Sequence, residues 1–182
     1  GTWHIQDEGV RFSTTLQAIQ SVQPLRADGV ITAANASQIC DGASACLIVS
    51  ESALKKYQLV PKARIVNLTI TAGDPVMMLE EPIFATERAV KKAGLKLDDI
   101  DLFEVNEAFA SVPLAWLKAL EVEPSRVNKF GGAIALGHPL GASGTKLMST
   151  LLHGLQREKK RYGLQTMCEG GGMANVTIIE AY

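Results

Sequence analysis

The sequence lacks an excess of either charge and any long apolar run. Its 182 residues carry 18 Lys and Arg against 19 Asp and Glu, a formal net charge of −1. Nucleic-acid and anionic-membrane binders need a strong basic excess, so the sequence predicts neither kind of partner. No apolar stretch approaches the roughly 18 residues that a membrane span requires. With 47% hydrophobic and 20% charged residues, the composition is typical of a soluble globular protein.

Cysteine is scarce as well. Cys40, Cys46 and Cys168 are the only three, and no two of them form a CxxC pair. Such a small, odd number excludes a disulfide scaffold, and without CxxC pairs no metal site is expected. Free thiols are typical of the reducing cytosol. Residues 1–11 are polar and lack the apolar centre of a signal peptide, which also favours a cytoplasmic location.

Motifs of several common enzyme classes are also absent. The sequence has no GxGxxG after a first strand, no GxxxxGK[ST] and no HExxH. Their absence excludes the usual dinucleotide, nucleoside-triphosphate and zinc-protease sites.

A regular alternation of strands and helices begins near residue 62. Strands are expected at residues 63–71, 101–105, 127–128, 163–168 and 174–180, and helices at 81–93, 107–120 and 142–158. This βαβαβαββ order predicts an α/β fold with a mixed, mostly parallel sheet. The last two strands are expected to be antiparallel because their connection is short. Pro113 is expected to kink the second of these helices.

Before residue 62 the pattern is weaker. Residues 15–21 and 51–57 predict short helices, and residues 29–33 predict a short strand. The segment 42–50 (GASACLIVS) is apolar almost throughout, which predicts a strand covered on both faces. Cys46 lies inside this run and is therefore expected to be buried.

Three places combine a reactive side chain with glycine or with the start of a helix. Asn106 stands where a strand gives way to a helix, and its simplest role is to cap that helix. His138 lies in the glycine-rich stretch 131–144, just before a helix rather than on a packed face. Cys168 ends a strand close to the triple glycine 170–172, whose N–H groups can bind an anion and favour ionisation of a thiol.

These three side chains are expected to converge at one edge of the sheet, where α/β folds bind ligands. An acid–base pair beside amide donors suits acyl or carbonyl chemistry, in which a developing oxyanion must be stabilised. His153 differs, because Ser149, Thr150 and Arg157 share its face of the last helix and predict that this face is exposed.

The motifs are similar to those of thiolases. NEAFA (106–110), GGAIALGHPLGASG (131–144) and CEGGG (168–172) resemble, in this order, three motifs of the C-terminal half of that family. The stretch GVITAANASQICDGASACLIVSES (29–52) resembles the segment that ends the N-terminal half. The resemblance covers essentially the whole chain. It implies transfer of acyl groups between CoA thioesters, by thiolytic cleavage of a 3-ketoacyl-CoA or by the reverse Claisen condensation.

The resemblance also implies a domain organisation. Thiolases have two similar βαβαβαββ halves in a five-layered body, with a loop domain inserted in the first half. By this comparison residues 1–27 are the tail of the loop domain, and residues 28–61 are the last helix and strand of the N-terminal domain with a linker. Residues 62–182 are the C-terminal domain.

The nucleophilic cysteine of the family belongs to the N-terminal half, and none of the three cysteines present lies in its motif. The implied partners are therefore an N-terminal thiolase half, on the same full-length chain or on a separate subunit, and further copies in a homo-oligomer.

Catalytic roles follow from the resemblance, motif by motif. His138 would deprotonate the nucleophile and help to bind the thioester oxygen, and Cys168 would move the proton at the α-carbon of the acyl-CoA. Asn106 would hold a water that completes one oxyanion hole, and the backbone N–H of Gly170 would serve the second. Claisen chemistry fits these roles, because a carbanion beside a thioester needs a base opposite an oxyanion hole.

Three further residues are implied in substrate binding. Ser37 resembles the residue that touches the pantetheine arm of CoA, and Ala108 and Phe109 resemble the lining of the acyl pocket. CoA and acyl-CoA would be substrates, and no covalently bound cofactor is implied.

The chain departs from the family pattern in two places, and two alternative functions stay open. Lys129 and Phe130 stand where most relatives have Asn before the double glycine, and Glu169 stands where a small apolar residue is more frequent. One alternative is another condensing enzyme of the superfamily, such as a ketosynthase, although these usually have His or Asn in place of Cys168. The other is a non-catalytic subunit that binds acyl-CoA or completes another chain.

Overall fold

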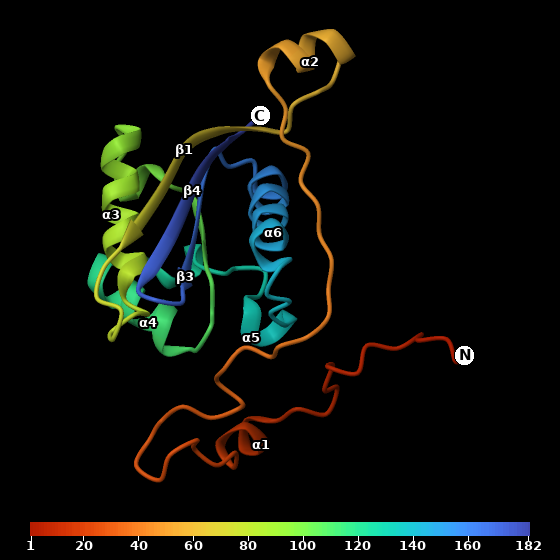
Figure 1. The fold of residues 1–182 in the computed structure, drawn as a ribbon, viewed down its shortest axis with the longest axis vertical. Coiled ribbons are helices and arrows are strands. Elements are labelled where there is room, and N and C mark those ends of the chain that lie inside the picture. Colours follow the sequence, from red (N-terminus) through yellow and green to blue (C-terminus); the bar gives the residue numbers. More distant parts are fainter.

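A four-stranded mixed sheet forms the centre of the computed structural model, which describes residues 1–182 (Figure 1). Its strands are β1 (Ala63–Ala72), β2 (Leu102–Val105), β3 (Tyr162–Glu169) and β4 (Met173–Ala181), in the order β1-β4-β3-β2. Only β2 and β3 are parallel, whereas β4 is antiparallel to both β1 and β3. The expected α/β class is confirmed, and the expectation of a mostly parallel sheet is wrong.

The antiparallel character has a local cause. β4 follows β3 through the tight glycine turn 170–172, so the expected antiparallel pairing of the last two strands is confirmed. β4 then lies between β3 and β1, and this position makes a second antiparallel pair. The strand expected at residues 127–128 is wrong, since only Val127 pairs, in an isolated parallel bridge with Phe103.

Helices cover both faces of the sheet. α3 (Glu81–Ala93) and α4 (Ser111–Leu120) lie on one face, and α6 (Ser143–Glu158) with the single turn α5 (Ala133–Leu136) lies on the other (Figure 1). The shorter elements are α1 (Leu16–Gln20), α2 (Glu51–Tyr57) and the 3-10 turns η1 (Leu97–Asp99) and η2 (Pro124–Arg126). No helix combines the length and the apolarity needed to cross a bilayer.

The main core fills the face covered by α3 and α4. Trp116 of α4 is fully buried, and its ring meets that of Phe103 edge-on at 5.1 Å between centroids. Its indole N–H donates to Thr86 Oγ1 at 3.0 Å, and that hydroxyl donates to Pro82 O at 2.7 Å. Both buried polar groups therefore have partners. These contacts join α3, α4 and β2 in one packed core.

The helix after β2 starts later than the sequence predicts. The sequence places its start at residue 107, whereas α4 begins at Ser111 with Ala110 at the N-cap. The capping role expected for Asn106 is therefore wrong. Pro113 lies in the first turn of α4, where a missing N–H breaks no helical hydrogen bond, so the expected kink has no cause.

Residues before β1 contribute little regular structure. The helices expected near 15–21 and 51–57 are present as α1 and α2. The strand expected at 29–33 is wrong, since only Thr32 pairs, in a bridge with Pro24. In Figure 1 this part of the chain runs below the sheet and then along the side of α6.

The apolar segment 42–50 is extended but belongs to no sheet. Leu47 and Ile48 are 81% and 72% exposed, and Cys46 is exposed, so the expected burial is wrong. A strand needs a neighbouring edge that pairs with its N–H and C=O groups, and the segment runs beside α6, which offers no such edge.

We predict that this segment drives association of the 182-residue chain. Exposed apolar side chains beside unpaired backbone favour pairing with another chain, and burying one aliphatic side chain contributes about 1.5–3 kcal/mol. Sedimentation velocity at micromolar concentration should show species larger than the monomer, and replacing Leu47 and Ile48 by Ser should shift the distribution toward the monomer. The control is Leu114→Ser on α4, which is 62% exposed and should change nothing. A monomer whose amides 45–49 resist hydrogen exchange would contradict the prediction.

Candidate active site

The carboxyl ends of β2 and β3 bring two of the predicted catalytic residues, Asn106 and Cys168, to one edge of the sheet. Asn106 follows β2, and its N–H donates at 3.0 Å to the carbonyl of Thr166, two residues before Cys168 in β3. Because the two strands are parallel neighbours, their ends lie side by side. His138 lies in the loop between α5 and α6, and α6 packs against β3.

Ser143 orients the imidazole of His138. Nδ1 of His138 lies 2.6 Å from the hydroxyl oxygen of Ser143, the first residue of α6. The same hydroxyl lies 3.0 Å from Pro139 O, which also accepts from the N–H groups of Ala142 and Ser143 at 2.8 Å. This arrangement holds the ring in place and leaves Nε2 without a partner in the chain. With Nδ1 as the donor to Ser143, a neutral imidazole has its basic lone pair on Nε2. Ser143 has no assigned role at the sequence level, because its partners depend on how the loop folds.

The surroundings favour the neutral form of this imidazole. Partial burial lowers the pKa of His138 below its usual 6.5, and the positive charge of Lys146 lowers it further. Because the pKa in the folded chain is below that in the unfolded chain, protonation opposes folding. This residue therefore costs stability as the pH falls through 6.5 toward the folded-state value, and the imidazole is neutral at neutral pH.

Burial has the opposite effect on the pKa of the Cys168 thiol. Desolvation raises this pKa above its usual 9.0, a hydrogen bond from the residue's own backbone N–H lowers it in part, and the charge of Glu169 raises it again. The expectation that the neighbouring glycines favour a thiolate is therefore wrong, because desolvation outweighs the backbone donor. At neutral pH the side chain is a protonated thiol, which suits the acid half of an acid–base role.

The glycine turn after Cys168 supplies a free hydrogen-bond donor. Gly171 and Gly172 have φ of 82° and 79°, and a Cβ on Gly172 would lie only 2.7 Å from Asp74 O. The turn therefore requires glycine in this place. The N–H of Gly170 has no acceptor within the chain and the residue is exposed. A free N–H two residues from the thiol can donate to a carbonyl oxygen of a bound substrate.

Asn106 carries an unsatisfied polar atom. The residue is 2% exposed, and its Oδ1 has no hydrogen-bond partner. A buried polar atom left unpaired costs about 1–3 kcal/mol, so it marks a position that a water or a ligand group completes.

The three residues implied in substrate binding lie together. The hydroxyl and the N–H of Ser37 both donate to Ala108 O, at 3.1 and 3.0 Å. The residue before Ser37 forms a bridge with Phe109, and the carbonyl of Gln38 accepts from the N–H of His138 at 2.7 Å. The segment 35–38 thus connects the start of α4 with the histidine loop.

Glu107, Asn128 and Lys146 hold the loop before His138, and sequence reasoning missed all three. Glu107 accepts from Asn128 Nδ2 at 2.7 Å and from the N–H of Ile134 in α5 at 3.1 Å. The side chain of Asn128 also accepts from the N–H and donates to the C=O of Val105, both at 2.8 Å, and so takes the place of the missing strand. Glu107 stood inside a recognised motif, but partners more than 20 positions away cannot be deduced from spacing.

A buried acid lies between these groups. Glu104 is 2% exposed; burial raises its pKa to about 8, repulsion from Glu107 raises it too, and Lys146 opposes both. Its Oε2 has no partner, and neither has Oε1 of Gln165, which is its register neighbour on β3. A neutral carboxyl is less costly to bury than a carboxylate, which is consistent with the raised pKa of Glu104.

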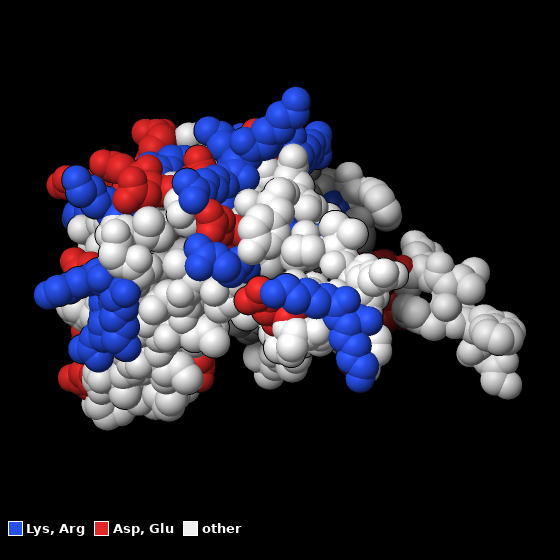
Figure 2. All heavy atoms as spheres, turned by 90° about the horizontal axis from the view of Figure 1, so that it is seen from above, with Lys and Arg blue, Asp and Glu red and all other residues white.

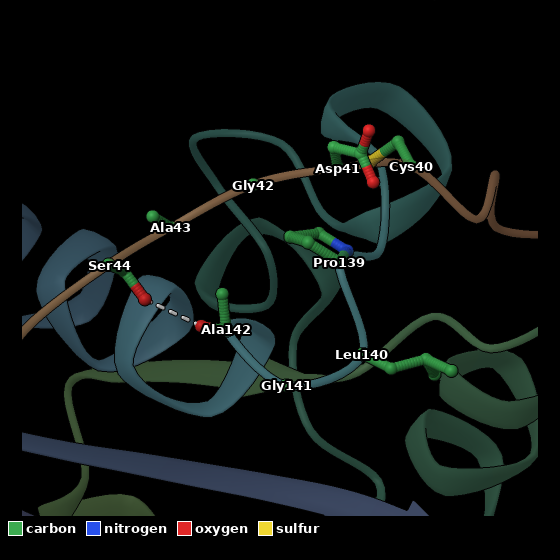
Figure 3. Close-up of a pocket in the computed structure, with 9 residues that line it drawn as sticks. All are labelled: Cys40, Asp41, Gly42, Ala43, Ser44, Pro139, Leu140, Gly141 and Ala142. Carbon is green, nitrogen blue, oxygen red and sulfur yellow. Dashed lines mark hydrogen bonds between the residues drawn. The ribbon is translucent and has the colours of Figure 1, made fainter.

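An open pocket of about 350 Å³ borders the histidine loop (Figure 3). It is lined by Cys40, Asp41, Gly42, Ala43, Ser44, Pro139, Leu140, Gly141 and Ala142. The extended segment crosses over the loop there, and the Ser44 hydroxyl donates to Ala142 O at 2.7 Å. None of the three predicted catalytic side chains lines this pocket.

The surface seen in Figure 2 carries Lys and Arg interspersed with Asp and Glu. This face therefore has no broad field of one sign, in keeping with the formal net charge of −1.

Comparison with known proteins decides the family. The family model "Thiolase, C-terminal domain" matches residues 59–181, and the model "Thiolase, N-terminal domain" matches residues 2–52. The chain belongs to the thiolase family. Steroid 3-ketoacyl-CoA thiolase FadA6 of Mycobacterium tuberculosis is 59% identical over 174 residues, which are 96% of this chain and 42% of that protein. The mitochondrial 3-ketoacyl-CoA thiolase of Homo sapiens is 46% identical over 176 residues, or 96% of this chain and 44% of that protein.

Solved thiolase structures share the fold. The acetyl-CoA acetyltransferase of Bacillus anthracis superposes with a TM-score of 0.90 at 36% identity, over 97% of this chain and 45% of that one. The human mitochondrial 3-ketoacyl-CoA thiolase in complex with CoA gives 0.89 at 43% identity, again over 97% and 45%. The chain thus spans less than half the length of these thiolases.

We predict that Cys168 is alkylated with a pH midpoint above 9.0, because burial disfavours the thiolate. Iodoacetamide labelling across a pH series, read by mass spectrometry of the peptide that contains Cys168, gives this midpoint. Glu169→Gln should lower it, because that substitution removes the negative charge that raises the thiol pKa. A midpoint at or below 9.0 in the unsubstituted chain would show that the glycine turn, and not burial, controls the thiol.

Proposed function

We propose that this chain is the C-terminal part of a thiolase that transfers acyl groups between CoA thioesters. The observation that carries the proposal is the 2.6 Å contact between His138 Nδ1 and Ser143 Oγ, which orients the imidazole and, with Nδ1 as the donor, makes Nε2 the base. Cys168 and the free N–H of Gly170 lie at the end of β3. With His138 as the base, Cys168 supplies an acid and Gly170 supplies an oxyanion donor.

The first step uses His138. Its Nε2 takes the proton from a cysteine thiol supplied by the N-terminal half, and the thiolate attacks the 3-keto carbon of a 3-ketoacyl-CoA. The bond between the α and β carbons then breaks, which leaves an acyl group on the cysteine and its electron pair on the enolate of the departing acyl-CoA.

Cys168 and its neighbours act on that enolate. The neutral thiol gives its proton to the α-carbon, and the thiolate that forms regains a proton from the CoA thiol. The CoA sulfur then attacks the acyl-enzyme, the bond between the acyl group and the nucleophilic cysteine breaks, and the released cysteine thiolate takes its proton back from the His138 imidazolium. The N–H of Gly170 and a water held by Asn106 stabilise the two oxyanions, one at each thioester. Ser37 would contact the pantetheine arm, and Ala108 and Phe109 would line the acyl pocket.

The proposed substrate class is 3-ketoacyl-CoA. Two relatives from very different organisms carry this substrate in their names, one of them for steroid derivatives. The catalytic groups described above act on the thioester and the keto group, which all members of this class share.

We predict that a chimera with the N-terminal half of the Mycobacterium tuberculosis relative, which is 59% identical, cleaves 3-ketoacyl-CoA. His138→Ala should lower its kcat at least about a hundredfold, the scale for loss of a general base or oxyanion donor. His153→Ala, on the exposed face of α6, should stay within about twofold. Turnover of acetoacetyl-CoA and of a long-chain 3-ketoacyl-CoA, with the 182-residue chain alone as an inactive blank, measures these effects.

Two outcomes would count against the proposal. Equal losses for both histidine variants would mean that the glycine-rich motif does not act in catalysis. A folded chimera without any turnover would instead favour a non-catalytic partner subunit.

A further inference from the structure

Lys146 caps the short helix that leads to His138. Its ammonium donates to Leu136 O at 3.1 Å and to Gly137 O at 2.9 Å. These are the carbonyls of the last residue of α5 and of the residue just before His138. Carbonyls at a helix C-terminus have no partner within the helix, so a cation placed there satisfies them.

α5 depends on side chains at both of its ends. It has only four residues, too few for a helix to be stable by itself. Glu107 binds the N–H of Ile134 at one end, and Lys146 binds the carbonyls at the other. Gly137 then turns with φ of 81°, and a Cβ there would lie 2.6 Å from Cys40 Sγ. The backbone just before His138 is therefore held by two charged side chains, Glu107 and Lys146, and has little room at Gly137.

The placement of Lys146 is not explained by the stability of its own helix. Lys146 lies in the first turn of α6, where a positive charge works against the helix dipole. Its two hydrogen bonds both leave α6 and go to the histidine loop. Lys146 therefore stabilises the histidine loop rather than its own helix.

We propose that Lys146 is a positioning residue that fixes the backbone entering His138 and thereby the direction of its Nε2. The inference rests on the proposed role of His138 as the base. The charge of Lys146 acts in the same sense, because it lowers the pKa of the imidazole.

Three other titratable groups face this loop. Glu104 on β2 interacts with Lys146, and burial raises its pKa to about 8; Glu107 lies before α4, and Cys40 lies against Gly137. Burial disfavours the charged form of Glu104, so Glu104 offsets the charge of Lys146 less than an exposed carboxylate would. Lys146 is thus the cation that acts on the histidine.

Three substitutions separate geometry from charge. Lys146→Met removes both the donors and the charge, Lys146→Gln keeps donors without charge, and Lys146→Arg keeps both. Lys118→Met is the matched control, since Lys118 is exposed on α4. Hydrogen exchange and NMR titration of the 182-residue chain read the loop directly, and kinetics of the chimera read its effect on turnover.

In Lys146→Met we expect the amides of Gly137 and His138 to exchange at least about tenfold faster, with β3 unchanged, and the pKa of His138 to rise. Lys146→Gln should raise that pKa with exchange close to the parent, and Lys146→Arg should change neither. In the chimera, Lys146→Met should lower kcat about tenfold or more with KM within about twofold, and Lys146→Arg should recover most of it. Lys118→Met should match the parent throughout.

Unchanged exchange and an unchanged histidine pKa in Lys146→Met would overturn the inference. Loss of protection throughout β3 would overturn it as well, because Lys146 would then support the whole domain and not the loop. A chimera without activity, together with the expected exchange and titration, would refute the proposed function and leave the positioning of His138 by Lys146 established.

Discussion

The site depends on one hydroxyl group. Ser143 Oγ lies 2.6 Å from Nδ1 of His138 and 3.0 Å from the carbonyl of Pro139, so it ties the imidazole to the first turn of α6. This contact fixes the orientation of the ring and leaves Nε2 as the nitrogen without a partner in the chain. The proposed role of the histidine as a base requires that Nδ1 donates to this hydroxyl, which leaves the free lone pair on Nε2.

Desolvation acts on both reactive side chains, and it favours the neutral form of each. It lowers the pKa of His138 and raises that of Cys168, so at neutral pH the first is an unprotonated base and the second a protonated acid. Acyl transfer between thioesters needs one group of each kind. One physical effect thus prepares two opposite functions, because one group is charged when protonated and the other when deprotonated.

The sequence predicted most of the helices and strands, and its errors have physical reasons. Helix ends such as the glycine after α3 are local and were predictable. The direction of β1 relative to β4 is set by packing across more than a hundred residues, which local patterns do not contain. The apolar segment 42–50 was predicted to be a buried strand because its residues are apolar. In this chain no neighbouring strand pairs with its backbone, and Leu47 and Ile48 stay exposed.

The supporting shell of the site was the hardest part to predict. Glu107, Asn128 and Lys146 are ordinary polar residues in the sequence, and their importance lies in partners on other elements. These contacts cannot be predicted from the sequence, because they depend on how the folded chain places α5 relative to the residues after β2 and to α6.

The nitrogen chemical shifts of the His138 side chain test the central claim most directly. At pH 7.5 the account predicts a protonated Nδ1 and an unprotonated Nε2 in the ¹⁵N spectrum of the 182-residue chain. A spectrum in which Nε2 carries the proton, or in which both nitrogens do, would contradict it.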